Sequence, residues 1–473
     1  MTIFSTIHGM GRFPVTICTL TVAYGASFAV CPAVQGGEAI EASDYSGALG
    51  ATALGGLAAI VDAPSTPTAP PAPAAPTPNG GWLDVSTWPL IPVPEIAVDP
   101  DSGATLGILP TWLHTNDQHE ITRIIAPDLT HNPYFGLGAH FRIFEYPSTD
   151  EQWNIVAGIR QRVERSVDYE FQKGRLRESN WTINTSLIFD RSGTPRYYGV
   201  GNESLLSNQT NYTASQLVAQ AQFGYNLNHT WQVQYTTRAR RMEVTQGTLA
   251  KVPSIETRYP YVHGLGTTNE VLNQVALVYD TRDDTTIPSR GTQWVAYAGV
   301  NGHNATISDS IYSMAGIDAR TYVPLPALPG LPILSDTIFA AHGAVRYLPS
   351  GHDIPFYDLS SIGGGESDIA GEQLLRGFGQ GRFVDRNSYA ASFEFRHRAF
   401  SFDAAASHVD IEVAPFLDVG RVSSKIGVNP FSALHKVVGV GFRGIARPSV
   451  VGYVDIGYGT EGTAVFTGIN YPF

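Results

Sequence analysis

Cysteine and clustered positive charge are what this sequence has least of. Its 473 residues include two cysteines, Cys18 and Cys31, and both lie close to the N-terminus. The rest of the chain therefore cannot carry a disulfide framework or a cysteine-based metal site. Charged residues make up 15% of the sequence and the formal net charge is -12, so the clustered lysine and arginine that bind nucleic-acid phosphates are missing. We expect no nucleic-acid partner.

Motifs of catalysis are missing as well. The sequence contains no Gly-x-Ser-x-Gly stretch of the kind that presents a nucleophilic serine. Its 13 histidines are scattered without the spacing of metal ligands. The run Gly363-Gly364-Gly365 is not followed by the Lys-Ser/Thr pair and the helix of a phosphate-binding loop. We therefore expect no enzymatic activity, no cofactor and no metal site.

Glycine and aromatic residues are abundant instead. The chain has 48 Gly, 22 Tyr and 22 Phe, a profile typical of many strands joined by turns. Beyond Gly103 no helix of 3.6-residue periodicity stands out, whereas apolar and polar residues alternate repeatedly. From Val409 to Val419 the odd positions are apolar, and the even positions include Asp410 and Asp418. This alternation predicts strands with one apolar and one polar face.

The stretch from Tyr389 to Arg398 alternates in the same way, with Phe393 and Phe395 on one face and Glu394 on the other. Because the polar faces carry both signs of charge and long polar loops separate the strands, the pattern predicts a transmembrane antiparallel β-barrel. A soluble all-β domain is the alternative. At about 9 to 11 residues per strand, residues 95–473 accommodate about 16 strands, and the length also allows fourteen or eighteen.

The first part of the chain differs in composition from the barrel segment. Residues 1–33 have an apolar stretch with small residues near its end and are predicted to be a secretory signal peptide, with a membrane anchor or a lipidated Cys31 as alternatives. Residues 34–94 include a Pro/Ala/Thr-rich run and are predicted to be a low-complexity linker. Within it, the Ala/Gly-rich run Gly47–Val61 leaves open a short plug helix. Residues 95–473 are predicted to form the barrel.

A long Gly-rich loop, Ser350–Phe383, is the most distinctive stretch of the barrel segment. Its second half places Arg376 beside Gly377 and Phe378. One interpretation is a surface loop with a solvated arginine; the other is a loop that folds back into the barrel and is fixed there by charge. A guanidinium suits the latter interpretation, because it binds a carboxylate through two parallel hydrogen bonds that fix orientation as well as charge.

Several motifs in this segment occur together and in a familiar order. On these motifs the sequence resembles the bacterial surface-antigen superfamily, which includes the outer-membrane assembly proteins BamA and TamA and the two-partner secretion translocators. The stretches that carry the resemblance are Tyr279–Asp283 with Pro288–Thr292, Leu375–Phe378, Phe416–Val422 and Val454–Gly459.

The resemblance implies that the loop with Arg376, Gly377 and Phe378 enters the barrel lumen, where the arginine pairs with luminal acids. The alternation described above independently places Asp418 and Glu394 on the polar face. We therefore expect Asp418 to be the main partner and Glu394 a nearby one. The alternative is that both acids face luminal water unpaired.

The resemblance also marks two other sets of residues. One set is a periplasmic turn motif, with Asp280, Arg282, Asp283 and Gly291. The other set, Gly468, Tyr471 and Phe473, resembles the C-terminal signal by which outer-membrane barrels are recognised for insertion; an ordinary last strand that ends in the aromatic belt is the alternative. Pro472 and Gly468 are also expected to weaken pairing between the last strand and the first.

The function that follows is insertion or translocation of protein or lipid at the outer membrane. A porin-like passive channel or a structural outer-membrane protein is the alternative. Assembly and secretion members of the superfamily carry periplasmic polypeptide-transport domains before the barrel, whereas this chain has a Pro-rich linker there. We expect as partners the outer-membrane lipid including lipopolysaccharide, the barrel assembly machinery during biogenesis, and a protein or lipid client that the sequence does not identify.

Overall fold

The computed structural model describes most of the chain from residue 91 onward. The described residues are 91–115, 121–148, 150–174, 177, 179–285, 287–302, 310–326, 336–366, 373–404, 407–427, 429–446, 450–469 and 473. The predicted signal peptide, almost all of the predicted linker, and Tyr471 of the C-terminal motif lie outside these residues. Within the described ranges, no helix is long and apolar enough to cross a membrane.

Nearly all of the regular structure is β-strand. The strands are β1 (Ile91–Asp99), β2 (Gly103–Thr115), β3 (Ile121–Ile125), β4 (Asp128–Asn132), β5 (Gly136–Ser148), β6 (Glu151–Arg160), β7 (Arg165–Lys173), β8 (Trp181–Ser192), β9 (Arg196–Tyr197), β10 (Thr210–Asn226), β11 (Trp231–Gln246), β12 (Gly266–Asp280), β13 (Gly291–Asn301), β14 (Ile311–Pro324), β15 (Thr337–His352), β16 (Ser360–Glu366), β17 (Gln373–Leu374), β18 (Phe383–Asp385), β19 (Asn387–Ala404), β20 (Ser407–Ser423), β21 (His435–Ala446), β22 (Val450–Gly459) and β23 (Gly462–Ile469). Short helical turns occur at Leu206–Asn208, Ile255–Arg258 (α1) and Phe356–Asp358.

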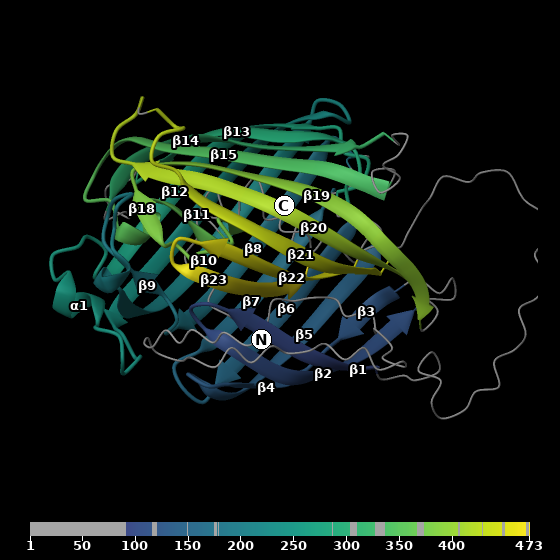
Figure 1. Cartoon of the computed structure of the whole chain (residues 1–473), viewed down its shortest axis with the longest axis horizontal. Coiled ribbons are helices and arrows are strands. Elements are labelled where there is room, and N and C mark those ends of the chain that lie inside the picture. The colour runs from purple at the N-terminus through teal and green to yellow at the C-terminus, as the bar shows by residue number, and fades with distance from the viewer. Residues whose placement is uncertain are drawn as a thin grey trace, which may run out of the picture.

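One sheet of 20 antiparallel strands forms the wall of a barrel, and a smaller sheet of three strands, β17-β16-β18, lies within the long loop (Figure 1). β3 and β4 are two parts of one barrel strand between β2 and β5, and β8 and β9 both pair with β10. Counting each of these pairs once leaves eighteen barrel strands. The transmembrane barrel is therefore confirmed, and its eighteen strands correspond to the larger of the two alternatives to the predicted count of about 16.

The barrel closes where its first strand meets its last. Val98 donates its backbone N–H to the Thr467 hydroxyl at 2.7 Å, which joins β1 to β23. β1 begins at Ile91, slightly before the predicted start of the barrel, and pairs along its whole length with β2. The sequence of β1 includes Pro92 and Pro94. Proline has no N–H to donate to a ladder, so it is tolerated in a strand at the edge of the sheet, where the barrel closes.

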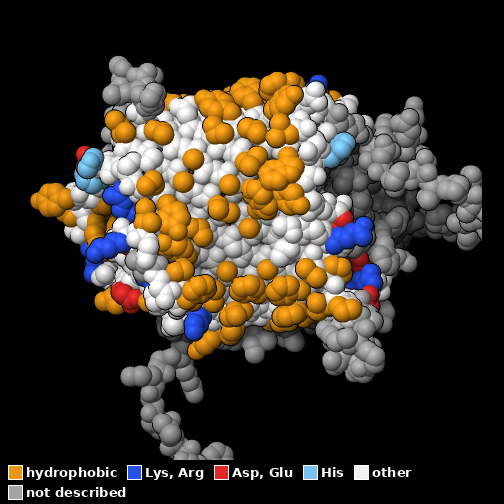
Figure 2. Space-filling model, turned by 90° about the horizontal axis from the view of Figure 1, so that it is seen from above, with side chains coloured by type: hydrophobic (Ala, Val, Ile, Leu, Met, Phe, Trp, Pro, Cys, Tyr) orange, Lys and Arg blue, Asp and Glu red, His pale blue; other side chains and the backbone are white. Residues whose placement is uncertain are grey.

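The predicted alternation is confirmed along the strands. On β19, the phenyl rings of Phe393 and Phe395 are 36% and 47% exposed on the outside, whereas Glu394 and Arg396 are buried on the inside. On β20 the even-numbered acids, Asp418 among them, are buried. Figure 2 shows the outcome on one face of the barrel, where hydrophobic side chains cover the middle and charged side chains lie toward the two ends. Apolar side chains face the lipid on the outside of the barrel, and the alternating polar side chains face its interior.

The two ends of the barrel differ. At the end that we call the loop end, β8 connects to β10, β11 to β12 and β15 to β19 through long segments that carry α1, β9 and the three-stranded sheet (Figure 1). At the opposite end, which we call the terminal end, β1 starts and β23 finishes. There Trp231, Tyr279 and Trp294 pack together on adjacent strands with ring centroids 5.0 to 5.5 Å apart. Such a group is typical of the aromatic belt at a membrane interface.

Candidate functional site in the barrel lumen

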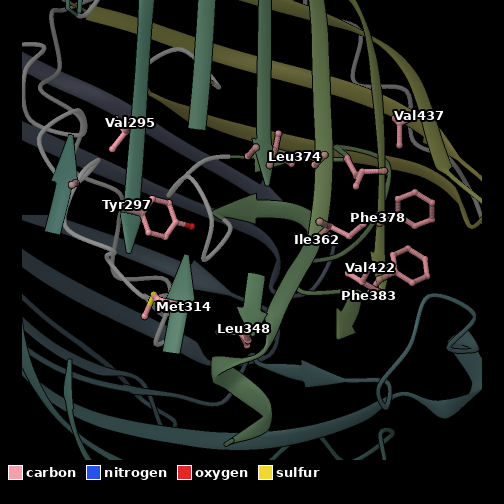
Figure 3. Packing of buried hydrophobic residues seen from close by; sticks show 14 of the residues in the cluster. Val295, Tyr297, Met314, Leu348, Ile362, Leu374, Phe378, Phe383, Val422 and Val437 are labelled. Carbon is pink, nitrogen blue, oxygen red and sulfur yellow. The ribbon is translucent and has the colours of Figure 1, made fainter. Parts of the chain in front are cut away.

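The long loop turns inward after β15 and packs inside the barrel wall. Leu374, Leu375 and Phe378 are 0 to 1% exposed and belong to the same buried cluster as Val437 on β21 and Val422 on β20. Figure 3 shows Leu374 and Phe378 with their barrel neighbours. The backbone turns sharply here, with Leu375 in the left-handed region at φ 64° and both Gly377 and Phe378 donating N–H groups to its carbonyl. This turn directs the Arg376 side chain toward the inner faces of β19 and β20, where it meets Ser392 and Asp418.

Arg376 is bound most extensively by Asp418. Its backbone N–H donates to Asp418 Oδ2 at 3.0 Å, its Nε donates to the same oxygen at 2.9 Å, and its Nη2 donates to Oδ1 at 2.8 Å. The Ser392 hydroxyl donates to Asp418 Oδ1 at 2.6 Å and accepts from Arg376 Nη2 at 2.9 Å. The guanidinium also lies over the Phe416 ring, 3.6 Å from its centroid. One carboxylate therefore fixes both the position and the plane of the guanidinium.

Two more acids complete the environment of this arginine. Nη1 of Arg376 donates to Glu394 on β19 and, at 2.9 Å, to Asp455 Oδ2 on β22. Arg443 donates to Glu394 at 2.8 Å, and Arg396 donates to the other oxygen of Glu394 at 2.8 Å. We call this group of three arginines and three acids the luminal ion cluster. Its charges balance, and the side chains in its ion pairs are fully buried.

Strand register brings the acids of the cluster together. Ser392 on β19 lies directly opposite Asp418 on β20, and both side chains point inward. Asp455 reaches the same place from β22, opposite Gly441. A Cβ atom at residue 441 would lie 2.3 Å from Asp455 Oδ1, so glycine leaves the space that this carboxylate occupies. Strands with the same alternation thus present three carboxylates to one guanidinium.

Glycine is required where the loop backbone meets the wall. A Cβ atom on Gly457 of β22 would lie 2.1 Å from the Arg376 carbonyl oxygen. A Cβ atom on Gly377 would lie 2.8 Å from Val437 and 2.9 Å from the backbone nitrogen of Gly459. Any larger residue at either position would push the loop off β22. The Gly positions in two of the family-type motifs are therefore explained by close backbone approach.

A further set of contacts fixes the loop at the loop end of the barrel. Arg382 donates to both oxygens of Glu461, in the β22–β23 turn, at 2.6 to 3.0 Å. It also donates to Ser204 and lies over the ring of Tyr198. The backbone N–H of Gln380 donates to Asp101 Oδ2, in the β1–β2 turn, at 2.7 Å. The loop therefore touches turns on both sides of the closing seam.

The C-terminal residue is buried inside the barrel. Phe473 is 3% exposed and packs with Tyr322 and Ala340, and its ring centroid lies 5.2 Å from that of His342. Its carbonyl oxygen accepts a hydrogen bond from Arg396 Nη2 at 2.9 Å. Since Arg396 also holds Glu394, the chain end is connected to the luminal ion cluster. The Gly468 backbone is in β23, opposite Tyr453.

The turn motif between β12 and β13 forms a compact unit at the terminal end. Arg282 donates to both oxygens of Asp280, and Asp283 accepts from the backbone of Ser289 and Arg290. Burial would raise the pKa of Asp283, but the hydrogen bonds from Ser289 and the backbone outweigh burial and hold this pKa below its usual value. Gly291 has φ 104°, which only glycine adopts freely. The motif has a structural explanation as a turn.

Sequence reasoning placed Arg376 with Asp418 and Glu394, and the structure brings these three side chains together. It did not assign a partner role to Asp455 on β22. It also missed Arg443 and the contact of Arg382 with Glu461. Among the described residues, no group of three or more His, Cys, Asp or Glu side chains is arranged to hold a metal ion.

The motifs and the barrel together resemble one family of outer-membrane proteins. The model of the Omp85 superfamily domain matches residues 150–445, which is more than half of the chain. The chain belongs to the Omp85 superfamily. The predicted relationship to BamA- and TamA-like barrels is thereby confirmed, and so is the outer-membrane location. Members of this superfamily are outer-membrane barrels for protein insertion or translocation.

Similar solved structures share little sequence identity with this Omp85 barrel. BamA from Haemophilus ducreyi lacking POTRA domains 1–3 is 12% identical, with a TM-score of 0.49, over 82% of this chain and 76% of that one. CdiB from Acinetobacter baumannii is 13% identical, with a TM-score of 0.46, over 80% and 59%. CdiB from Escherichia coli is 10% identical, with a TM-score of 0.44, over 81% and 62%. The chain thus spans less than two thirds of either CdiB. A search of curated proteins finds no match.

Proposed function

We propose that this Omp85 barrel inserts or translocates polypeptide or lipid at the outer membrane by parting the seam between β1 and β23. The Arg376 loop acts as a latch that holds the lumen and the seam in the closed state. The observation that carries this proposal is the weakness of the seam beside strands that are otherwise fully paired.

The seam has few hydrogen bonds for its length. Between residues 91–99 and 462–469, the structure describes no backbone ladder; the contacts are those of Thr467 with Val98 and with the Ile96 carbonyl. Because the N–H of Val98 points toward β23, the same strand parity would direct Pro94 and Pro92 toward β23 as well. Proline has no N–H to donate, so these positions cannot contribute ladder bonds. Separation of this seam costs less than separation of any neighbouring pair.

The loop supports the latch role by touching both sides of the seam. Gln380 holds the turn after β1 through Asp101, and Arg382 holds the turn before β23 through Glu461. The luminal ion cluster anchors the same loop deeper in the barrel through Arg376. Opening of the seam at the loop end therefore requires these ion and hydrogen bonds to break or the loop to move with one side.

A disulfide across the seam tests the mechanism. In a background with Cys18 and Cys31 changed to serine, Val98→Cys with Thr467→Cys joins β1 to β23, and Val98→Cys with Ala104→Cys joins β1 to β2 as a matched control. The assay is insertion of a small barrel protein into proteoliposomes. We expect oxidation to stop insertion for the seam pair, reduction to restore it, and the control pair to work in both states. Full insertion with the seam crosslinked, or no insertion by the wild type, would contradict the proposal.

The latch role has a separate test. Arg376→Ala removes every side-chain contact of the loop with Asp418, so we expect protease to cleave the loop and the folded barrel to lose heat resistance on unboiled gels. Arg142→Ala is the control, because Arg142 is an equally buried luminal arginine and is paired with Asp128 on β4. It is expected to lower heat resistance without exposing the loop. Unchanged protease access in Arg376→Ala would refute the latch.

A porin-like channel is the other candidate, and one observation favours it. Toward the terminal end, the wall from β6 to β11 is lined by amide side chains, among them Gln152, Gln222 and Gln232, which suit a path for small polar solutes. Planar bilayers distinguish the two functions. A wide, steady current that Arg376→Ala leaves unchanged indicates a channel, whereas a current that rises in Arg376→Ala supports the latch.

A further inference from the structure

The outer surface of the barrel carries a pair of arginines where opposite charges or apolar residues would be expected. Arg165 on β7 and Arg191 on β8 are directly opposite in the strand register. Arg165 precedes Ser166 and Arg191 follows Asp190. Because Ser166 and Asp190 are buried and face inward, the two arginines point outward. Side chains at such positions have Cβ atoms about 4.5 to 5.5 Å apart, and like charges there destabilise the sheet. An anion between them would reverse the sign of that interaction.

The described residues provide no such anion. The guanidinium of Arg191 is exposed and has no hydrogen bond or ion pair with any described side chain. Arg165 donates through Nη1 to the backbone carbonyls of Arg160 and Glu164, which fixes it without neutralising it. The nearest acids, Glu164 and Asp190, are 3% and 4% exposed and lie on the inner side. The buried carboxylate of Glu164 attracts Arg165 from the inner side, whereas Arg191 has no carboxylate partner among the described residues.

A third arginine lies just beyond this pair. Arg162, in the turn between β6 and β7, is exposed and donates through Nη1 to the Tyr134 carbonyl oxygen at 3.1 Å. That bond uses one nitrogen of the guanidinium, and the exposed side chain lies three residues before Arg165 in the sequence. Arg162, Arg165 and Arg191 together form what we call the rim arginines.

The residues immediately below the rim arginines are apolar. Val167 lies opposite Phe189, one step further along the same outward face, and the two are 47% and 44% exposed. Ile159 and Leu187 extend the surface and are 54% and 55% exposed. Positive charge thus meets an apolar surface at the loop end. Outer-membrane barrels have their longer loops outside the cell, so this border lies at the level of the outer-leaflet headgroups.

We propose that the rim arginines bind the phosphate group of a phosphorylated outer-leaflet glycolipid whose acyl chains lie on Val167, Phe189 and their neighbours. Arginine suits this ligand because its planar fork matches phosphate oxygens in pairs. The apolar surface directly below is what distinguishes a lipid phosphate from a free one. The site is independent of the seam, so its failure would leave the proposed function untouched.

Titration with defined ligands tests the proposal on the full-length barrel in detergent micelles. The probes are lipid A with its phosphates, the same lipid without phosphates, and inorganic phosphate, with binding followed by native mass spectrometry. We expect Arg165→Ala with Arg191→Ala to weaken binding of phosphorylated lipid A by about 10-fold or more. Arg165→Lys with Arg191→Lys should recover part of the lost affinity, since lysine keeps the positive charge but lacks the paired donors of the guanidinium.

The control is Arg123→Ala, because Arg123 is an exposed arginine at the terminal end, paired with Glu145; it should bind like the wild type. If the double variant does not fold, Arg191→Ala alone removes an exposed side chain and should still weaken binding several-fold. Wild-type affinity in these variants would overturn the proposal. So would equal binding of the lipid without phosphates, or competition by inorganic phosphate at the concentrations that lipid A needs.

Discussion

The two inner walls of this barrel hold polar groups in different ways. The wall from β19 to β22 carries the luminal ion cluster, in which Arg376 is surrounded by Asp418, Glu394 and Asp455. Toward the terminal end, the wall from β6 to β11 carries amides that bond to one another, such as Gln232 to Asn226 at 2.6 Å, and we call this part the amide wall. Toward the loop end, the same strands carry charged groups such as Arg240, which is paired with Glu270. A neutral amide that loses a hydrogen-bond partner leaves no buried charge uncompensated. Buried charges need their partner, so the loop and the charged wall are interdependent.

The difference locates the movable part of the protein. A loop fastened by ion pairs is held strongly while all partners are present and weakly once one is removed. An amide wall changes little when one bond is lost. Function that involves loop movement is therefore expected to depend on the wall from β19 to β22, and each of the following changes tests that contrast.

Removal of a carboxylate from the ion cluster should have the largest effect. Asp418→Ala leaves an excess of buried positive charge and removes every carboxylate bond to the Arg376 backbone and Nε, so we expect a loss of about 3 to 5 kcal/mol in the free energy of unfolding. Urea unfolding in micelles, followed by gel mobility, measures it. A loss below about 1 kcal/mol would mean that the charged wall behaves like the amide wall.

A rim carboxylate at the loop end should have an intermediate and pH-dependent effect. Burial raises the pKa of Glu164, in the β6–β7 turn, to about 7 against an ordinary value of 4.5, and hydrogen bonds from Gly193 and Ser192 only partly oppose this. Between these two values the folded state binds more protons than the unfolded state, so stability falls as pH rises. We expect a fall of about 2 kcal/mol from pH 5 to pH 8.

Glu164→Gln tests this assignment, because the amide does not titrate. Heat resistance on unboiled gels, measured from pH 5 to pH 8, should be flatter for Glu164→Gln than for the wild type. Glu461→Gln serves as the control and should keep the wild-type slope, since Glu461 is an ion-pair partner of Arg382. An unchanged slope in Glu164→Gln would show that another group titrates.

A change within the amide wall should have the smallest effect. Gln232→Leu removes hydrogen bonds with Thr182, Asn226 and Gln234, and we expect a loss of about 1 kcal/mol because neutral hydrogen bonds contribute little net stability each. The loop should stay protected from protease. Urea unfolding measures the change in the free energy of unfolding. Cleavage of the loop by protease in Gln232→Leu would contradict the independence of the two walls.

Much of the site was predictable because its signals are local. The period-two alternation gave the polar face of Glu394 and Asp418, and the resemblance to a known superfamily implied the inward path of the loop. The contacts that were not predicted join residues that are far apart in the sequence. The contact of Arg382 with Glu461 and the burial of Phe473 against His342 join segments whose spacing carries no pattern.

The sequence by itself determined the barrel and its membrane-facing surface, because alternation along a strand reports directly which face meets lipid. The resemblance to a known superfamily implied that Arg376 enters the lumen. Only the tertiary structure decided which side chains meet across the lumen, how the seam closes and which outward charges lack a partner. Those facts depend on strand register and on the path of the loop. Both are set by packing of the whole chain, so neither is encoded in a local pattern.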